Sequence, residues 1–259
     1  MPDGKPFRLD FIPVVGITHE QAMARVVLAH ERYPLAQRGE HKHPVAVVGG
    51  GPSLLDRLEE LRGWPGDIWA INRTADWLQE RGIYCTLLMI DPADIPSKAP
   101  RALLASACHP NVFEGKEVRI FDCGEHSEDG VIGGTTTAGR APMLALKLGY
   151  PGVALFGCDS SFDTFDHVDR HETYPDVLMI RANGKDFKTY PELQMQAACL
   201  AEVVRELPMF AVNKSGGLLE AMVADPEWEV VAVSDNLKQS LIDINGDSGI
   251  YDQPYVAQG

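Results

Sequence analysis

The stretch Val47-Val48-Gly49-Gly50-Gly51-Pro52-Ser53-Leu54 joins an apolar run, typical of a buried strand, to the start of a helix. Glycine at such a junction lets the main chain turn sharply and leaves room for a ligand, and the helix N-terminus beyond it offers free N–H groups with a partial positive charge. We therefore predict a turn that binds the phosphates of a nucleotide. A tight turn that packs the helix on the sheet and binds nothing is the alternative interpretation. The predicted nucleotide-binding residues of this turn are Gly49, Gly50, Gly51, Pro52 and Ser53.

Two familiar phosphate motifs do not fit this turn. A dinucleotide fingerprint, G-x-G-x-x-G, requires glycine where the chain has Leu54 and an acidic residue near the end of the next strand, where it has Asn72. A P-loop requires glycine followed by lysine, and Gly51 is followed by Pro-Ser-Leu-Leu. The turn is therefore of another kind.

The composition excludes several classes of partner and setting. The formal net charge of -14 over 259 residues would repel nucleic acid and anionic lipid, so we expect neither as a partner. We also expect no membrane insertion, because no apolar run approaches the ~20 residues of a membrane span, and the first ten residues lack a signal-peptide core. Five widely spaced cysteines without a C-x-x-C pair are typical of reduced thiols in the cytoplasm.

Short apolar runs alternate with helical patterns along the chain. Runs without polar alternation are typical of strands covered on both faces. The alternation predicts an α/β fold with a doubly wound, mostly parallel sheet and helices on both faces, Rossmann-like in arrangement. The predicted strands are Val45–Val48, Ile68–Ile71, Cys85–Ile90, Val118–Phe121, Val153–Phe156, Met209–Val212 and Val230–Val233. The predicted helices are a Thr18-capped helix to about Gln37, Leu54–Leu61, Ala75–Gly82, Thr137–Leu148, and Pro191–Glu206 with a capping box at Thr189.

We divide the chain into three parts on this basis. Residues 1–43 form an N-terminal lead-in and helix, residues 44–235 form the Rossmann-like nucleotide-binding domain, and residues 236–259 form a C-terminal helix and tail.

Polar side chains follow the predicted strands, where ligands bind in such a sheet. Asn72 is placed to bond a base edge or a ribose, or else only to stabilise its turn. Asp91 brings a carboxylate to the edge of the core, where Mg²⁺ or a ligand hydroxyl would serve as its partner. A second small-residue loop opens a helix with three hydroxyls and predicts another nucleotide contact, with a plain threonine cap as the alternative. Its residues are Thr135, Thr136 and Thr137.

A segment rich in aspartate and histidine follows the predicted strand Val153–Phe156. Four aspartates and two histidines fall within residues 159–171. Asp159 lies nearest the strand end and, with Asp91, is a candidate ligand of Mg²⁺. His167 and His171 have the right pKa range for a general base. A polar flexible lid is the alternative interpretation of the later part of this segment.

The order and spacing of these landmarks resemble a known family. The chain resembles the MptE-like 6-hydroxymethylpterin diphosphokinases, which include domains of bacterial motility accessory factors. The same landmarks resemble bacterial sialyltransferases that act on lipooligosaccharide and have a related Rossmann-like fold. The matching stretches, over roughly residues 44 to 220, are Val48–Leu54, Trp69–Asn72, Gly82-Ile83, Ile90–Pro92, Leu148–Tyr150 and Phe156–Asp159.

The resemblance implies a site as well as a fold. It implies that the Gly-Pro-Ser turn holds nucleotide phosphate, that Asn72 and Asp91 line the same pocket, and that Thr136 and Thr137 contact the nucleotide or donor group. The diphosphokinases imply magnesium. The sialyltransferases use a histidine shortly before the helix that here begins near Pro191, and this chain has Asn183-Gly184-Lys185-Asp186 there instead. That departure counts against straightforward sialyl transfer.

The sequence thus predicts a cytoplasmic, nucleotide-binding transferase with Mg²⁺ as cofactor. The catalytic residues we expect are Asp91, Asp159, His167 and His171. The specific form is diphosphoryl transfer from ATP or GTP to a hydroxylated small molecule. Two alternatives stay open: glycosyl transfer from a CMP- or UDP-sugar to a sugar acceptor, and a nucleotide-binding module without catalysis. A homo-oligomer is compatible with either.

Overall fold

The centre of the molecule is a parallel sheet of seven strands. A computed structural model describes residues 17–162, 168, 177–234 and 255–256 of the chain. Within them the strand order is β5-β4-β3-β2-β1-β6-β9, and every neighbouring pair runs parallel. The predicted α/β fold with a mostly parallel sheet is confirmed. The strands are β1 (Val45–Val48), β2 (Ile68–Ile71), β3 (Thr86–Met89), β4 (Arg101–Ala105), β5 (Glu117–Phe121), β6 (Val153–Phe156) and β9 (Ala211–Asn213).

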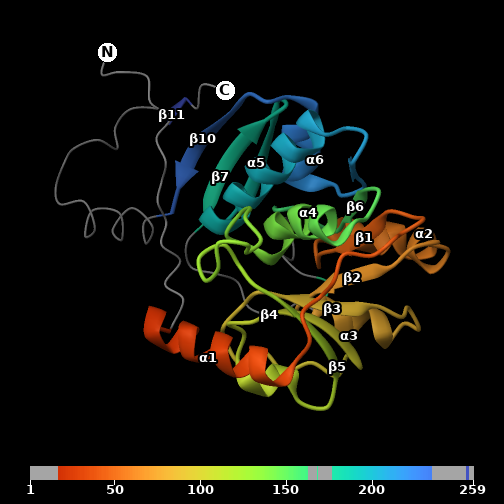
Figure 1. The fold of residues 1–259 in the computed structure, drawn as a ribbon. Helices are drawn as coiled ribbons and strands as arrows, with labels where there is room; N and C mark the ends of the chain where they lie inside the picture. The colour runs from red at the N-terminus through yellow and green to blue at the C-terminus, as the bar shows by residue number, and fades with distance from the viewer. Residues whose placement is uncertain (1–16, 163–167, 169–176, 235–254, 257–259) are drawn as a thin grey trace.

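Helices connect the strands. Because the chain steps outward from β1 in both directions, right-handed crossovers place the connections on opposite faces of the sheet. Figure 1 shows α1 beside β4 and β5, and α5 with α6 at the other end of the molecule. The helices are α1 (His19–Arg32), α2 (Leu58–Arg62), α3 (Thr74–Gln79), α4 (Thr137–Leu148), α5 (Pro191–Glu206) and α6 (Gly217–Ala224), with 3-10 turns η1 (Pro52–Arg57) and η2 (Pro110–Phe113).

A second, antiparallel sheet lies beside α5 and α6 (Figure 1). Its order is β11-β10-β7-β8, from β7 (Leu178–Ala182), β8 (Lys185–Thr189), β10 (Trp228–Val233) and β11 (Tyr255–Val256). The predicted strand Val230–Val233 therefore belongs to this sheet and not to the parallel one. Its side chains are half-buried or exposed, as in a sheet with one open face.

Four strands escape the apolar-run criterion: β4, β7, β8 and the two-residue β11, which lies in the part predicted as a C-terminal helix and tail. The strand β4 reads Arg-Ala-Leu-Leu-Ala, a composition of strong helix formers, yet four of its five residues are buried between β3 and β5. The strands β7 and β8 alternate or are mostly polar and exposed, because they lie in the outer sheet. The position of each segment in its sheet, and not its intrinsic β propensity, determines that it forms a strand.

Helix ends differ from the predictions in instructive ways. Thr18 caps α1 in a full capping box with Gln21, as predicted, but the helix ends at Arg32 because the chain becomes extended and Leu35 bridges to Ile120 of β5. The cap of α5 is Tyr190, and the Thr189 hydroxyl donates instead to Ser160 O at 2.6 Å. The predicted helix Leu54–Leu61 begins earlier, as η1, and continues as α2.

Two further expectations concern the thiols and the helices. All five cysteines are free, in agreement with the expected reduced thiols, and four of them are buried. In the part of the chain that the structure describes, no helix combines the length and the apolar character that a membrane crossing would require.

The β1 and β6 backbones come unusually close where the two strands end. Gly49 donates its N–H to Phe156 O at 2.8 Å, and Gly51 donates to Gly157 O at 2.7 Å. A Cβ atom on Gly49 would lie 2.5 Å from Gly157 O. Gly157 itself has a φ of 56°, in the left-handed region that favours glycine. Glycine at these positions is therefore required by the contact between two segments of main chain.

We predict that Gly49→Ala lowers the free energy of unfolding by about 2–3 kcal/mol, because the added methyl group meets a backbone carbonyl that cannot rotate away. Gly63→Ala is the matched control, since its nearest atoms are 3.8 Å away, and we expect a change within about 0.5 kcal/mol. Urea denaturation of the two variants measures both values. Equal free energies of unfolding for the two variants would contradict this prediction, because they would show that the β1 and β6 main chains can move apart to accept the methyl group.

Candidate functional site

The order of the strands defines one topological switch point. The chain builds β1 to β5 in one direction and then returns to place β6 on the other side of β1. In open parallel sheets, ligands bind where the direction reverses, at the carboxyl ends of the strands. We call this region the switch-point site, formed by the loops that follow β1, β2, β3 and β6 and by the N-terminus of α4. All of the predicted site residues that the structure describes fall within it.

Asp159 occupies the middle of the glycine turn. Its carboxylate accepts the N–H of Ser53 at 2.7 Å, the hydroxyl of Ser53, and the N–H of Gly216 at 3.1 Å. A Cβ on Gly51 would lie 2.7 Å from Asp159 Cγ. The side chain therefore clips together the loops after β1, β6 and β9, and we call this arrangement the Asp159 clip.

The clip changes the interpretation of the glycine turn. The Ser53 N–H, expected to hold a phosphate, already bonds a protein carboxylate, and a phosphate beside Asp159 would meet a like charge. Gly49 and Gly51 serve the approach of the β6 loop. In this conformation the arrangement fits the packing alternative for Gly49, Gly51 and Ser53 better than direct phosphate binding.

Asp159 is a poor magnesium ligand where it lies. It is 3% exposed and both carboxylate oxygens accept hydrogen bonds. Burial raises the pKa of its carboxyl, against the donors Ser53 and Gly216, which lower it. Asp159 and Asp91 follow β6 and β3, which are three strand spacings apart, or about 14 Å. The structure does not bring these two carboxylates to one ion.

The backbone after Asp159 is held in an uncommon conformation by residues that the sequence analysis did not assign to the site. Ser160 has a φ of 57°. Its carbonyl accepts the Thr189 hydroxyl at 2.6 Å and its hydroxyl accepts from Gln196 Nε2 at 3.0 Å. The Ser215 hydroxyl accepts the N–H of Cys158 at 2.9 Å. Of these residues, only Ser215 could have been noticed in the sequence, because it lies in a loop of small residues that follows a strand.

Asn72 places a buried acceptor in the switch-point site. Its Oδ1 atom is buried and has no hydrogen-bond partner among the described residues. Its backbone has a φ of 49°, and its N–H donates to Leu88 O at 3.2 Å at the end of β3. Because a buried acceptor without a donor costs about 1–3 kcal/mol, this oxygen calls for a donor from a bound water or a ligand.

The remaining predicted residues surround the end of β3. Asp91 is half-buried and its Oδ1 accepts the N–H of Ala93 at 2.8 Å, which leaves acceptor capacity on the carboxylate. Thr137 Oγ1 accepts the N–H of Ile90 at 3.4 Å, so the N-terminus of α4 touches the same strand end. Thr136 is the N-cap and accepts the N–H of Gly139 at 3.1 Å, while Thr135 is exposed.

The two predicted histidines, His167 and His171, lie outside the described residues. Of residues 163–176 the structure describes Val168, whose N–H donates to Gly50 O at 2.8 Å.

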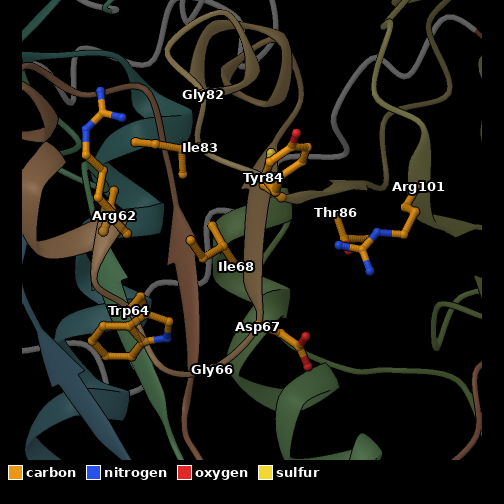
Figure 2. Close-up of a pocket in the computed structure, with 12 residues that line it drawn as sticks. Arg62, Trp64, Gly66, Asp67, Ile68, Gly82, Ile83, Tyr84, Thr86 and Arg101 are labelled. Atoms are coloured by element: carbon orange, nitrogen blue, oxygen red, sulfur yellow. The ribbon is translucent and has the colours of Figure 1, made fainter.

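A separate hollow lies at the opposite edge of the sheet. It has a volume of about 360 Å³ and is lined by residues at the amino ends of β2, β3 and β4 (Figure 2). Tyr84, Arg62 and Arg101 at its rim are exposed. Among the described residues the buried atoms without partners are on Asn72, Gln79 and His126, which do not line it. Size alone does not make it the functional site.

A solved structure has the same arrangement of elements. The chain superposes on the structure of the MAf glycosyltransferase from Magnetospirillum magneticum AMB-1 with a TM-score of 0.59. The two share a fold. The sequences are 21% identical, and the match covers 76% of this chain but 36% of the other, so this chain spans about a third of that protein's length. No protein-family model and no curated protein match the sequence.

We predict that Asp159→Asn lowers the free energy of unfolding by about 3 kcal/mol, because an amide presents N–H groups to the donors of Ser53 and Gly216. Asp91→Asn is the control, since Asp91 accepts one N–H at the surface of the site, and we expect less than about 1 kcal/mol. Urea denaturation of both variants tests this. A small effect for Asp159→Asn would show that the clip carries no stability.

Proposed function

We propose that the chain is a nucleotide-dependent transferase that binds its nucleotide in the switch-point site. The observation that carries this proposal is the buried, unpaired Oδ1 of Asn72 at the reversal of strand order. An amide oxygen there matches an N–H of a base or a ribose hydroxyl. The fold shared with a protein described as a glycosyltransferase supports the transferase class.

The phosphates would lie toward α4 in this proposal. Among contacts between described residues, the N–H groups of Thr137 and Ala138 in its first turn have no acceptor, while those of Gly139 and Arg140 bond Thr136. A helix N-terminus with free N–H groups attracts anions. The Thr135 side chain is exposed beside it. Thus α4, and not the glycine turn, is the better phosphate-binding element.

Two chemistries fit this arrangement. In diphosphoryl transfer, an acceptor hydroxyl attacks the β-phosphorus, the bond to the α-phosphate oxygen breaks, and the nucleoside monophosphate leaves. In glycosyl transfer, the hydroxyl attacks the anomeric carbon and the nucleotide leaves with the glycosidic oxygen. Both release the hydroxyl proton, for which His167 and His171 stay our predicted bases. The fold neighbour is a glycosyltransferase, and for this reason we keep the second chemistry beside the first.

Magnesium stays part of the proposal through Asp91 alone. Asp91 retains acceptor capacity near the N-terminus of α4, whereas Asp159 does not fit a metal ligand. A nucleoside triphosphate carries Mg²⁺ on its own phosphate oxygens, and one carboxylate commonly completes such a site. The acceptor would be a hydroxylated small molecule or a sugar.

Calorimetric titration with ATP, GTP, CTP, CMP and UDP, each with and without Mg²⁺, tests the proposal. We expect one of them to bind. Mg²⁺-dependent binding of a triphosphate would support diphosphoryl transfer, and metal-independent binding of CMP or UDP would support glycosyl transfer. Binding without turnover would leave a nucleotide-binding module. If none binds, the proposal is wrong.

We further predict that Asn72→Gly weakens nucleotide binding at least about tenfold, the effect of losing one well-placed hydrogen bond. Glycine adopts the positive φ without strain, so the backbone is preserved. Asn183→Gly is the matched control, because Asn183 has a φ of 50° in the turn between β7 and β8, remote from the switch-point site. Equal affinities of the two variants would exclude Asn72 from binding.

A further inference from the structure

A tight turn after β5 gathers three side chains of metal-binding type. Cys123, Glu125 and His126 follow the strand in the pattern C-x-E-H. The N–H of His126 donates to Cys123 O at 2.9 Å, which closes the turn. The N–H of Val131 donates to Asp122 O at 2.7 Å and anchors the far side of the loop. We call residues 123–126 the Cys123 turn.

The turn brings the three functional groups within coordination range of one another. One ligand atom from each of Cys123, Glu125 and His126 lies within 4.8 Å of the other two. In the described part of the chain this is the one group of three or more such residues that meets this distance. Ligand atoms around a tetrahedral zinc ion are about 3.3–3.6 Å apart, given Zn–S near 2.3 Å and Zn–N near 2.0 Å. A contraction of about 1 Å, within the reach of side-chain rotation, would complete the geometry.

A second observation points to a ligand. The Nδ1 atom of His126 is buried and has no hydrogen-bond partner among the described residues. A buried ring nitrogen normally donates to or accepts from a neighbour. Nothing in the proposed nucleotide site uses this histidine.

The acidic side chains at and beside the Cys123 turn form ion pairs with basic side chains. Arg140 is 6% exposed and forms a two-pronged ion pair with Glu125, one contact at 2.7 Å. The same guanidinium donates to Gly134 O at 3.0 Å and to Val131 O at 3.3 Å. Asp122, next in the chain to Cys123, pairs with His30 at 2.9 Å. Arg140 therefore orients the Glu125 carboxylate, as outer partners of metal ligands commonly do.

We propose that the Cys123 turn binds a zinc ion through Cys123, Glu125 and His126. A thiolate, an imidazole and a carboxylate together favour zinc over magnesium or calcium, which prefer oxygen ligands. Three protein ligands leave the fourth tetrahedral position to water. The thiolate and the carboxylate supply two negative charges to the ion, and Glu125 can share its oxygens between the ion and Arg140.

Binding releases one proton. The Cys123 thiol loses its proton to solvent as the Zn–S bond forms, and Glu125 and His126 bind in their neutral-pH forms. Burial raises the pKa of the Cys123 thiol to about 11, with Arg140 acting to lower it.

The ion would act on the switch-point site through α4. Arg140 belongs to α4 and holds the carbonyl of Gly134, just before Thr135 and the cap Thr136. Fixing Glu125 on a metal fixes the partner of Arg140, and so steadies the loop before α4. The zinc ion would thus have a structural role, and it would not contact the nucleotide.

Cobalt titration of tag-free, chelator-treated full-length protein tests the site. We expect one Co²⁺ per chain, a thiolate-to-cobalt charge-transfer band, and loss of that band when Zn²⁺ is added. Cys123→Ser should abolish the band. His126→Gln, at a half-buried position where misfolding is a smaller risk, should weaken binding at least tenfold, and circular dichroism checks the fold of both.

The chain offers matched controls. Cys85 is buried and its thiol pKa is also raised to about 11, so Cys85→Ser tests the general effect of losing such a thiol. His109→Gln removes another half-buried histidine beside a carboxylate, Asp94 at 3.5 Å. Both should bind Co²⁺ like the unaltered protein. The absence of a stoichiometric band, or its survival in Cys123→Ser with unchanged affinity in His126→Gln, would overturn the proposal.

Discussion

The buried carboxylate of Asp159 holds together the loops at the carboxyl edge of the sheet. It bonds the loop after β1 through Ser53 and the loop after β9 through Gly216, while its own loop follows β6. These hydrogen bonds require the main chains after β1 and β6 to lie very close together. At Gly49 and Gly157 the approach leaves no room for a Cβ atom, so only glycine fits. Because the carboxylate satisfies the donors of the glycine turn internally, the open acceptor at Asn72 and the free first turn of α4 become the places where a ligand adds something new.

The sequence predicted the position of the candidate residues in the sheet better than the contacts that each one makes. Asn72, Asp91 and Asp159 were found because each ends an apolar run, and parallel strands bring their ends to one edge. The function of Asp159 as a clip was not visible, because its partner Ser53 is 106 residues away and nothing local distinguishes a carboxylate that faces donors from one that faces solvent. In the same way β4 was missed because leucine and alanine favour helices when burial is unknown.

The helix α4 joins the two candidate sites. Its first residues touch the end of β3 through Thr137, and its Arg140 reaches the Cys123 turn through Glu125. Most of its side chains are buried, which leaves few ways for the helix to shift without disturbing the core. The Arg140 guanidinium donates inside the protein, to the Glu125 carboxylate and to two backbone carbonyls.

The placement of β1 between β2 and β6 has a consequence for the nascent chain. β2 follows β1 closely in sequence, but β6 leaves the ribosome more than a hundred residues later, roughly 5 to 20 s at ordinary translation rates. Through that interval one side of the Val45–Val48 strand has no partner, and four apolar residues without a charge or proline offer an edge to which other chains can pair. The risk of aggregation through this edge is therefore greatest during synthesis. It ends once β6 pairs with β1 and Asp159 bonds the loops beside it.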